Sequence, residues 1–261
     1  MTVTHMNGAG NDFAIIDARG KEDLDFSALA KKYCAHTGAD GFMAVGLSET
    51  ADFRLHFYNS DGTRGEMCGN GARCICRYAF ELGLVGEKMT VQTDAGLVLG
   101  QRISENIYRV GLNLPSVMDL NRLSDAAYVE LGDPGVPHSV TEIPGLTWEQ
   151  RDELREFAKN MRHNPAFPKG ANANLYAWLD ESTIRILTFE RGVEDYTLAC
   201  GTGSASTAVT LWKMGKVPAG QLTVKNPGGD LKVTIENRGD AITALWLEGP
   251  TEIVNITEET L

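Results

Sequence analysis

The sequence predicts one mixed α/β unit that is used twice along the chain. A segment that begins Cys68-Gly69-Asn70-Gly71-Ala72 continues with apolar residues and stops at Gly83, and a second, beginning Cys200-Gly201-Thr202-Gly203-Ser204, stops at Gly215. In each, the closing glycine stands 15 positions after the cysteine, and the two cysteines are 132 positions apart. Because self-similarity at a fixed period indicates a repeated structural unit, we expect two related domains.

Short runs of β-branched and aromatic residues, bounded by Gly, Asn and Asp, predict strands before and after each cysteine segment. The predicted strands cover residues 13–16, 53–57, 90–93, 108–112, 175–179, 184–189 and 222–224. Four helices are predicted, at 26–33, at 147–161 and directly after Cys68 and Cys200. A strand that ends in Asp, at 13–17 in the first half and 175–180 in the second, extends the repeat upstream.

The composition is that of a globular protein, with 43% hydrophobic and 23% charged residues in 261. This length suits one large domain or two of about 130 residues, and the repeat favours two. We place the boundary at a predicted loop, residues 115–119, which gives domains 1–115 and 116–249.

The charge balance limits the classes of partner. The chain has 24 Lys and Arg residues against 35 Asp and Glu residues, a formal net charge of −11. An acidic surface repels phosphate backbones and anionic lipid, so we expect neither a nucleic-acid nor a membrane partner. The start of the chain lacks the pattern of a signal peptide, and the apolar runs are far shorter than the roughly 20 residues of a membrane span. We therefore expect a cytoplasmic protein.

Each Cys-Gly-x-Gly segment predicts a turn that enters a helix, with the cysteine at or just before the N-cap. The first N–H groups of a helix have no partner within the helix, and the dipole is positive at this end. A cysteine placed there has a lowered pKa, in the range of about 3.5 to 7.5, so a thiolate is accessible at neutral pH. The same N–H groups can bind a carboxylate, and glycine lets it approach the backbone closely.

Two such segments in pseudo-symmetric halves suit the inversion of a carbon centre. We expect a small carboxylate to bind in an interdomain cleft between the two helix N-termini, with Cys68 on one side and Cys200 on the other. One cysteine, as a thiolate, removes a proton from one face of the carbon, and the other, as a thiol, returns a proton to the opposite face.

Other interpretations of the cysteines and glycines are weaker. The odd number of five cysteines, in a chain too large to need disulfides, indicates reduced thiols, and we interpret Cys34, Cys74 and Cys76 as packing residues. Cys74 and Cys76 are too closely spaced for a Cys-x2-Cys zinc site, and no paired histidine motif accompanies them, so we expect no metal. The Walker A motif and the full dinucleotide fingerprint are both missing, which disfavours a phosphate site.

Three stretches of sequence, Met6 to Phe13, Phe57 to Cys74 and Phe189 to Gly203, resemble the motifs of the diaminopimelate epimerase family. Members of that family invert one α-carbon of diaminopimelate without pyridoxal phosphate, so the resemblance implies no cofactor. It implies an α+β fold of two pseudo-symmetric domains, each a curved, mostly antiparallel sheet wrapped around a central helix. It also implies that a strand near Ile253, within residues 250–261, returns to the first domain, and it suggests a homodimer.

The resemblance assigns roles to single residues. It implies that Cys68 and Cys200 are the acid–base pair and that His138 and Glu190 tune them, with Glu190 also near the substrate ammonium. Arg191 offers a bidentate fork for a second carboxylate. The substrate-binding residues that the resemblance implies are Asn11, Asn59, Asn172 and Glu190. To these we add Arg191 and, for the α-carboxylate, the backbone N–H groups of Gly69, Asn70, Gly201 and Thr202.

One residue departs from the family pattern. The family commonly has Gly-Asn-Pro-His where this chain has Gly135-Val136-Pro137-His138, and the valine side chain cannot hydrogen-bond. A racemase of another amino acid, such as histidine, therefore stays open, as does a non-catalytic amino-acid binder or redox sensor. Asn59, Asn172 and Arg191 favour a substrate with a polar, anionic far end, as in conversion of LL- to meso-diaminopimelate for lysine and cell-wall precursors.

Overall fold

The computed structural model describes residues 1–21, 23–65, 68–217 and 219–258. Its chain divides into two units, the first made of Met1–Gly111 and Glu248–Leu261 and the second of Leu112–Leu247. Residues 259–261 of the predicted C-terminal segment, and Met67 of the first cysteine motif, lie outside the described residues.

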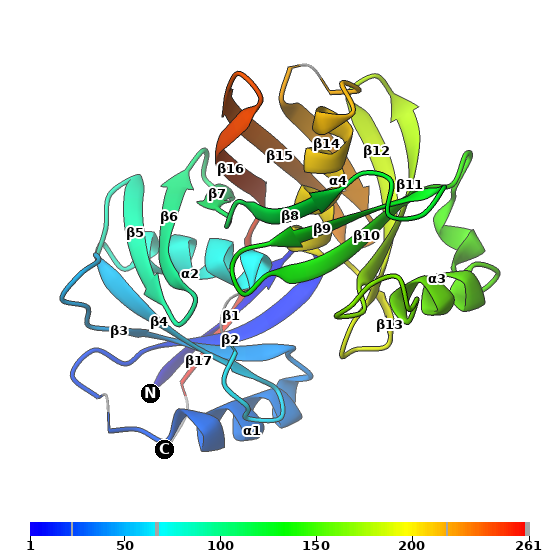
Figure 1. The fold of residues 1–261 in the computed structure, drawn as a ribbon. Coiled ribbons are helices and arrows are strands. Elements are labelled where there is room, and N and C mark those ends of the chain that lie inside the picture. The colour runs from blue at the N-terminus through cyan, green and yellow to red at the C-terminus, as the bar shows by residue number, and fades with distance from the viewer. Residues whose placement is uncertain (22, 66–67, 218, 259–261) are drawn as a thin grey trace. The chain divides into compact units, whose positions relative to one another are not determined.

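The first unit is a mostly antiparallel sheet wrapped around helix α2 (Figure 1). Strand β2 is parallel to β3, β3 antiparallel to β4, β4 parallel to β5, and β5 antiparallel to β6. Strand β17 pairs antiparallel with β1, with Ile253 opposite Met6. The elements are β1 (Thr2–Gly8), β2 (Asn11–Asp17), α1 (Phe26–Thr37), β3 (Gly41–Gly46), β4 (Phe53–Asn59), α2 (Gly69–Glu81), β5 (Lys88–Thr93), β6 (Gly96–Arg102), β7 (Ile107–Gly111) and β17 (Glu252–Glu258).

The two faces of this sheet pack against different helices. Successive residues of a strand point to opposite faces. The Phe13 ring lies on the α2 side, close to Gly71, whereas Ala14 joins the hydrophobic cluster under α1. In that cluster the rings of Tyr33 and Phe42 stack with centroids 5.9 Å apart. Helix α2 is therefore the central helix of the unit, and α1 covers the other face.

The second unit repeats this order of pairings around helix α4. Strand β10 is parallel to β11, β11 antiparallel to β12, β12 parallel to β14, and β14 antiparallel to β15. Helix α4 packs against β9, β10, β11, β14 and β15, and α3 packs against β11 and β12. The elements are β8 (Pro115–Asp119), β9 (Ala126–Leu131), β10 (Val136–Glu142), the 3-10 turn η1 (Trp148–Arg151), α3 (Arg155–Arg162), β11 (Asn172–Asp180), β12 (Thr183–Glu190), β13 (Asp195–Thr197), α4 (Gly201–Lys213), β14 (Gln221–Asn226), β15 (Gly229–Arg238) and β16 (Ala241–Pro250), within which the unit ends.

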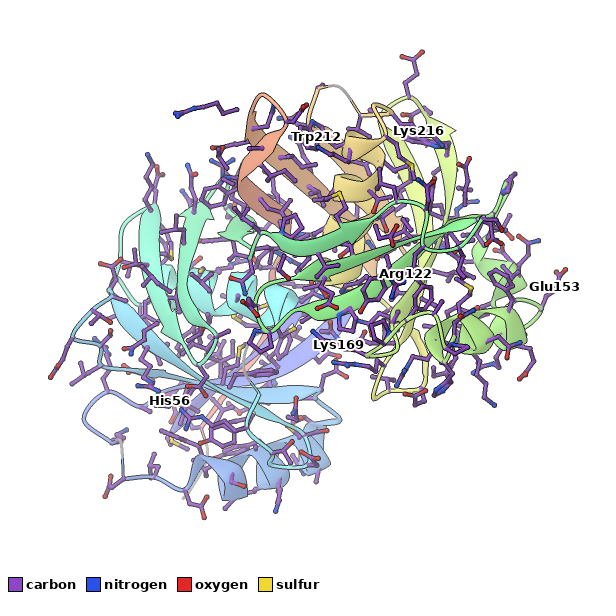
Figure 2. All side chains as sticks on the ribbon, viewed as in Figure 1. His56, Arg122, Glu153, Lys169, Trp212 and Lys216 are labelled. Carbon is purple, nitrogen blue, oxygen red and sulfur yellow. The ribbon has the colours of Figure 1, made fainter. Side chains whose placement is uncertain are left out.

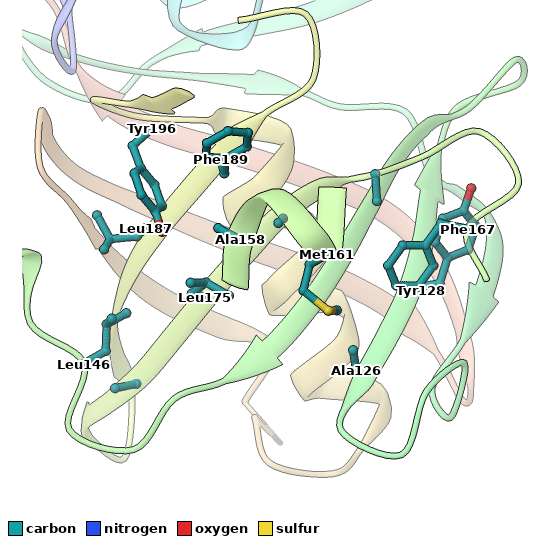
Figure 3. Packing of buried hydrophobic residues seen from close by; sticks show 13 residues of the cluster. Ala126, Tyr128, Leu146, Ala158, Met161, Phe167, Leu175, Leu187, Phe189 and Tyr196 are labelled. Atoms are coloured by element: carbon teal, nitrogen blue, oxygen red, sulfur yellow. The ribbon is translucent and has the colours of Figure 1, made fainter. Parts of the chain in front are cut away.

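A hydrophobic cluster beneath α3 fixes the strands that carry several predicted site residues (Figure 3). The rings of Tyr128 and Phe167 stack at 5.3 Å, and those of Phe189 and Tyr196 meet edge to face at 5.5 Å. Met161 of α3 packs into the same cluster. Each large apolar side chain that is fully buried contributes about 1.5–3 kcal/mol relative to exposure, so the ends of β11 and β12 are firmly held.

The α+β fold class predicted from the sequence is confirmed, with a curved and mostly antiparallel sheet around a central helix in each unit. All seven predicted strands are present, as are the helices after Cys68 and Cys200. The predicted helix at 147–161 consists of two elements, η1 and α3. Among the described residues, no helix is both long and apolar enough to cross a membrane.

Two details of the sequence analysis are wrong. Residues 115–119 were predicted as a loop but form strand β8, which pairs antiparallel with β9. Pro115 is tolerated because it occupies the first position of this strand, where proline costs least. The strand 175–180 is also not the counterpart of 13–17. It belongs to β11, which follows the outer helix α3 and therefore matches β3, whereas the counterpart of β2 is β10.

Candidate active site

Helices α2 and α4 begin in the same way, directly after the two cysteines. Cys68 is the N-cap of α2 with φ −123° and ψ 122°, and Cys200 is the N-cap of α4 with φ −116° and ψ 109°. Each helix has 13 residues, and each closes at a glycine in the left-handed region, Gly83 with φ 67° and Gly215 with φ 75°. The repeat read from the sequence is therefore a repeat of helix starts and stops.

In the first unit, a chain of side chains connects two of the predicted substrate-binding residues. Asn70 donates from Nδ2 to Oδ1 of Asn11 at 2.6 Å, and Asn11 donates from Nδ2 to Oδ2 of Asp40 at 3.1 Å. The amide oxygen of Asn70 accepts a hydrogen bond from Nη2 of Arg73 at 2.9 Å. Asn11 is thus held at the first turn of α2, close to Gly69 and the partly exposed Cys68.

Asn59 lies at the end of β4 and is exposed. Its Nδ2 donates to Oγ1 of Thr63 at 3.0 Å, and its backbone N–H donates to the Thr63 carbonyl at 2.8 Å. These contacts hold the turn that follows β4. They do not connect Asn59 to Asn11 or Asn70, so its role as a substrate contact stays a prediction.

In the second unit, the Cys200 sulfur is buried at the first turn of α4. The backbone N–H of Gly203 donates to Sγ at 3.3 Å, and Oγ1 of Thr202 lies 3.5 Å from the sulfur. Gly201 and Thr202 are partly exposed, so their backbone N–H groups are at an accessible helix end. The sulfur is therefore held by the N–H group of Gly203, one of the first-turn groups that make the helix end positive.

Glu190 ends β12 and lies beside Cys200. Burial raises the pKa of its carboxyl group, and the neighbouring Thr197 and Cys200 side chains act in the opposite direction. The structure thus brings a carboxyl group and a thiol together in this unit, as the resemblance implies.

His138 is fully buried on β10, opposite Asn172 of the parallel strand β11. Asn174 places Nδ2 3.2 Å from His138 Nδ1 and donates to the Ser139 carbonyl at 2.8 Å, while its oxygen accepts from Oγ1 of Thr188 at 2.9 Å. The Asn174 amide nitrogen also lies 3.2 Å from the Asn172 carbonyl oxygen, so three acceptors surround its two hydrogens. Burial, followed by the charge of Arg191, lowers the pKa of His138 to about 3.

Arg191 follows β12 and is exposed. Its backbone N–H donates to Oδ1 of Asn172 at 2.7 Å, and Nη1 donates to the carbonyl of Lys169 at 3.3 Å. Lys169, labelled in Figure 2, itself donates to Oε2 of the buried Glu130 at 2.6 Å. Asn172 therefore positions the backbone at Arg191, and the guanidinium keeps further donors for a ligand.

Three residues that hold the predicted site were not found from the sequence: Asp40, Arg73 and Asn174. Arg73 lies within the motif Phe57 to Cys74, where the resemblance gives it no role, and Asn174 stands two positions after Asn172 on the same strand. Residues i and i+2 of a strand share a face, which is the signal that could have indicated Asn174. Among the described residues, no group of three or more His, Cys, Asp and Glu side chains could hold a metal ion.

Comparison with protein families gives one match that spans most of the chain. The family model described as diaminopimelate epimerase matches residues 3–111 and 132–254. A diaminopimelate epimerase of Chlorobaculum tepidum is 35% identical over 255 residues, covering 95% of this chain and 97% of that protein. One of Aquifex aeolicus is 34% identical over 245 residues, covering 87% and 86% respectively.

Solved structures share the fold at low sequence identity. A phenazine biosynthesis protein of the PhzF family from Bacillus anthracis has a TM-score of 0.73 at 16% identity, covering 100% of this chain and 99% of its own. A probable proline racemase from Agrobacterium radiobacter, with bound carbonate, has a TM-score of 0.69 at 15% identity, covering 100% and 93%.

Proposed function

Because the chain belongs to the diaminopimelate epimerase family, as its motifs predicted, we propose that it converts LL- to meso-diaminopimelate with two cysteines as acid and base. The observation that carries this proposal is the placement of a cysteine at the N-cap of the central helix in each unit. A thiolate takes the proton from the α-carbon and becomes a thiol. The carbanion that remains takes a proton from the second thiol on its opposite face, which becomes a thiolate.

The α-carboxylate binds to backbone N–H groups at the helix starts in this proposal. The N–H groups in question are in the first turns of α2 and α4, where they have no acceptor within the helix. They belong to Gly69, Asn70, Gly201 and Thr202. Fixed donors at the carboxylate also stabilise the negative charge that spreads onto it when the α-proton leaves.

Glu190 and His138 act on the Cys200 side. The Glu190 carboxyl group lies against the thiol and is placed to hold the substrate ammonium, which further stabilises the carbanion. His138 is neutral over the whole physiological pH range, since burial lowers its pKa to about 3. Its Nε2 is buried and has no hydrogen-bond partner among the described residues. Arg191 binds the distal carboxylate through its exposed guanidinium.

The test follows deuterium uptake from D2O at the α-carbon of LL-diaminopimelate, together with the appearance of the meso form. We expect Cys68→Ala and Cys200→Ala each to lose at least about 100-fold in turnover, the usual contribution of a positioned acid or base. Cys34→Ala is the matched control, because Cys34 is buried in α1 and burial raises its pKa to about 11. Full activity in either Cys68→Ala or Cys200→Ala would overturn the proposal.

A second candidate, racemisation of a simpler amino acid such as histidine, is favoured by Val136. This residue begins β10, two positions before His138, and its apolar side chain is 38% exposed. Incubation with a panel of L-amino acids, followed by chiral chromatography, separates the two functions. Turnover of a mono-carboxylic amino acid, without turnover of diaminopimelate, would establish the second. Tight binding without isotope exchange would instead indicate a non-catalytic binder.

A further inference from the structure

Arg73, in the second turn of α2, carries a buried charge that the proposed mechanism does not use. The residue is 0% exposed. Its Nη1 donates to the carbonyl of Gly69 at 3.2 Å and its Nη2 to Oδ1 of Asn70 at 2.9 Å, and both acceptors are neutral. Its Nε has no hydrogen-bond partner within the described part of the chain.

A buried guanidinium needs an anion close by. Arginine stays protonated in proteins, and removing a charge from water is costly unless an opposite charge accompanies it. Burial lowers the pKa of Arg73, and the sulfurs of Cys74, Cys68 and Cys76, when ionised, oppose that shift. The hydrogen bonds to Gly69 and Asn70 place the guanidinium at the first turn of α2, directly after Cys68, so the sulfurs of these three cysteines are the neighbouring groups able to take a negative charge.

Of the three sulfurs, Cys68 is the one placed to ionise. Cys74 and Cys76 are fully buried, and burial raises the pKa of each thiol to about 12. Cys68 is partly exposed and caps the helix, where the dipole favours a negative charge.

Charged groups on the elements packed against α2 are engaged elsewhere. On β2, Asp17 pairs with Arg19 at 2.7 Å and Asp12 accepts from Nδ2 of Asn7. On β6 and β7, Arg102 lies 3.4 Å from Glu87 and Arg109 donates to Gln101. On β1, His5 lies 3.4 Å from Oγ1 of Thr257, and Asp40, next to β3, accepts from Asn11.

The second unit has the opposite arrangement at the same helix position. Counted from the N-cap cysteine, the residue that corresponds to Arg73 is Ala205, which is buried. The charged neighbour of Cys200 is the Glu190 carboxyl group instead. A cation favours ionisation of a nearby thiol, and a carboxylate opposes it.

We propose that Arg73 is a positioning residue that holds Cys68 as the thiolate in the free protein, so that Cys68 begins as the base and Cys200 as the acid. This inference rests on the proposed two-cysteine function, which leaves open which thiol is ionised before substrate binds. It assigns a role to a residue that need not touch the substrate.

The test measures alkylation of each cysteine by iodoacetamide between about pH 5 and pH 9, with rates read peptide by peptide by mass spectrometry, because the thiolate is the reacting form. In the wild type we expect Cys68 to reach its half-maximal rate at a lower pH than Cys200. In Arg73→Gln we expect the Cys68 rate near neutral pH to fall at least about 10-fold, and in Arg73→Lys to fall less. Cys200, measured in the same samples, is the internal control and stays within about twofold.

A second variant tests the inference in case Arg73→Gln does not fold. Asn70→Asp keeps the arginine but places a carboxylate beside it, and we expect it to slow Cys68 alkylation in the same direction. Coincident pH profiles for Cys68 and Cys200 in the wild type, or an unchanged Cys68 profile in folded Arg73→Gln or Asn70→Asp, would overturn the inference. Alkylation does not require turnover, so a wild type that alkylates as expected but epimerises nothing would instead refute the proposed function.

Discussion

Helices α2 and α4 share their length, their N-cap residue type and their closing glycine, but their first turns pack against different side chains. At α2 the neighbours are Asn70, Asn11 and the buried cation of Arg73. At α4 they are Glu190, Thr202 and Asn174, and Asn174 in turn contacts His138. The repeated backbone thus supplies two similar helix N-termini, while the side chains give the two thiols different electrostatic surroundings. Two-base chemistry needs this difference, because one thiol must start ionised and the other protonated.

The largest expected effect is on turnover, when the carboxyl group beside Cys200 is removed and the difference between the two thiols is reduced. We expect Glu190→Gln to reduce epimerisation at least about 100-fold, since the side chain proposed to hold the substrate ammonium loses its negative charge. The same change should make Cys200 alkylate faster at a given pH, because a carboxylate no longer opposes its ionisation. Turnover and alkylation are measured on the same preparation.

Glu194→Gln is the matched control for that experiment. Glu194 lies on the loop directly after β12 and pairs with Arg162 at 2.8 Å, away from Cys200. We expect its turnover to stay within about twofold of the wild type. An equal loss in the two variants would mean that the loop, and not the Glu190 carboxyl group, is responsible.

A second prediction compares the third residue of each helix, Gly71 and Gly203. A methyl group at Gly203 would collide with Oδ1 of Asn174 and lie 3.2 Å from Oγ1 of Thr188. That collision breaks a buried network, so we expect Gly203→Ala to lower the free energy of unfolding by about 2–3 kcal/mol. At Gly71 the nearest atom is Sδ of Met43 at 3.1 Å, the adaptable part of a flexible side chain.

We therefore expect Gly71→Ala to change the free energy of unfolding by less than about 1 kcal/mol, since the better helix propensity of alanine offsets the contact. Urea denaturation of both variants measures the difference, with the slope of each transition checked for a common unfolded state. Equal destabilisation would show that the two first turns are packed alike and that the Asn174 network is not a special feature of the second unit.

The sequence was most informative where a pattern is local. The helix starts after the two cysteines, their closing glycines and seven of the strands follow from neighbouring residues, and the structure has them where they were predicted. Strands β1, β6, β15 and β16 were not predicted although their burial alternates. Strands β3 and β9 were also not predicted, and all their residues are buried, so no alternation marks them. Arg73 and Asn174 were missed for a related reason. Arg73 matters because it is buried, and Asn174 because it contacts side chains on β10 and β12. The residue types alone show neither the burial nor these contacts.

The smallest effect concerns His138, and it tests whether the second unit really holds a neutral imidazole. Its pKa is lowered from the usual 6.5 to about 3 by burial, with Arg191 as a smaller cause. Between these two values the unfolded chain binds a proton that the folded chain does not. Stability therefore rises as the pH increases through this range, by up to about 1.4 kcal/mol per pH unit from this residue, and the contribution levels off above about pH 6.5.

His138→Gln should remove this part of the slope, so that the unfolding free energies of wild type and variant, measured by urea denaturation, converge as the pH falls from about 6.5 towards 4. His36→Gln is the control, because His36 is exposed near the end of α1 and its replacement should leave the slope unchanged. Parallel stability curves for wild type and His138→Gln would mean that His138 takes up its proton in the folded protein. A charged imidazole would then contact Asn174, which lies against Gly203 in the first turn of α4, and the electrostatic contrast between the two thiols would shrink.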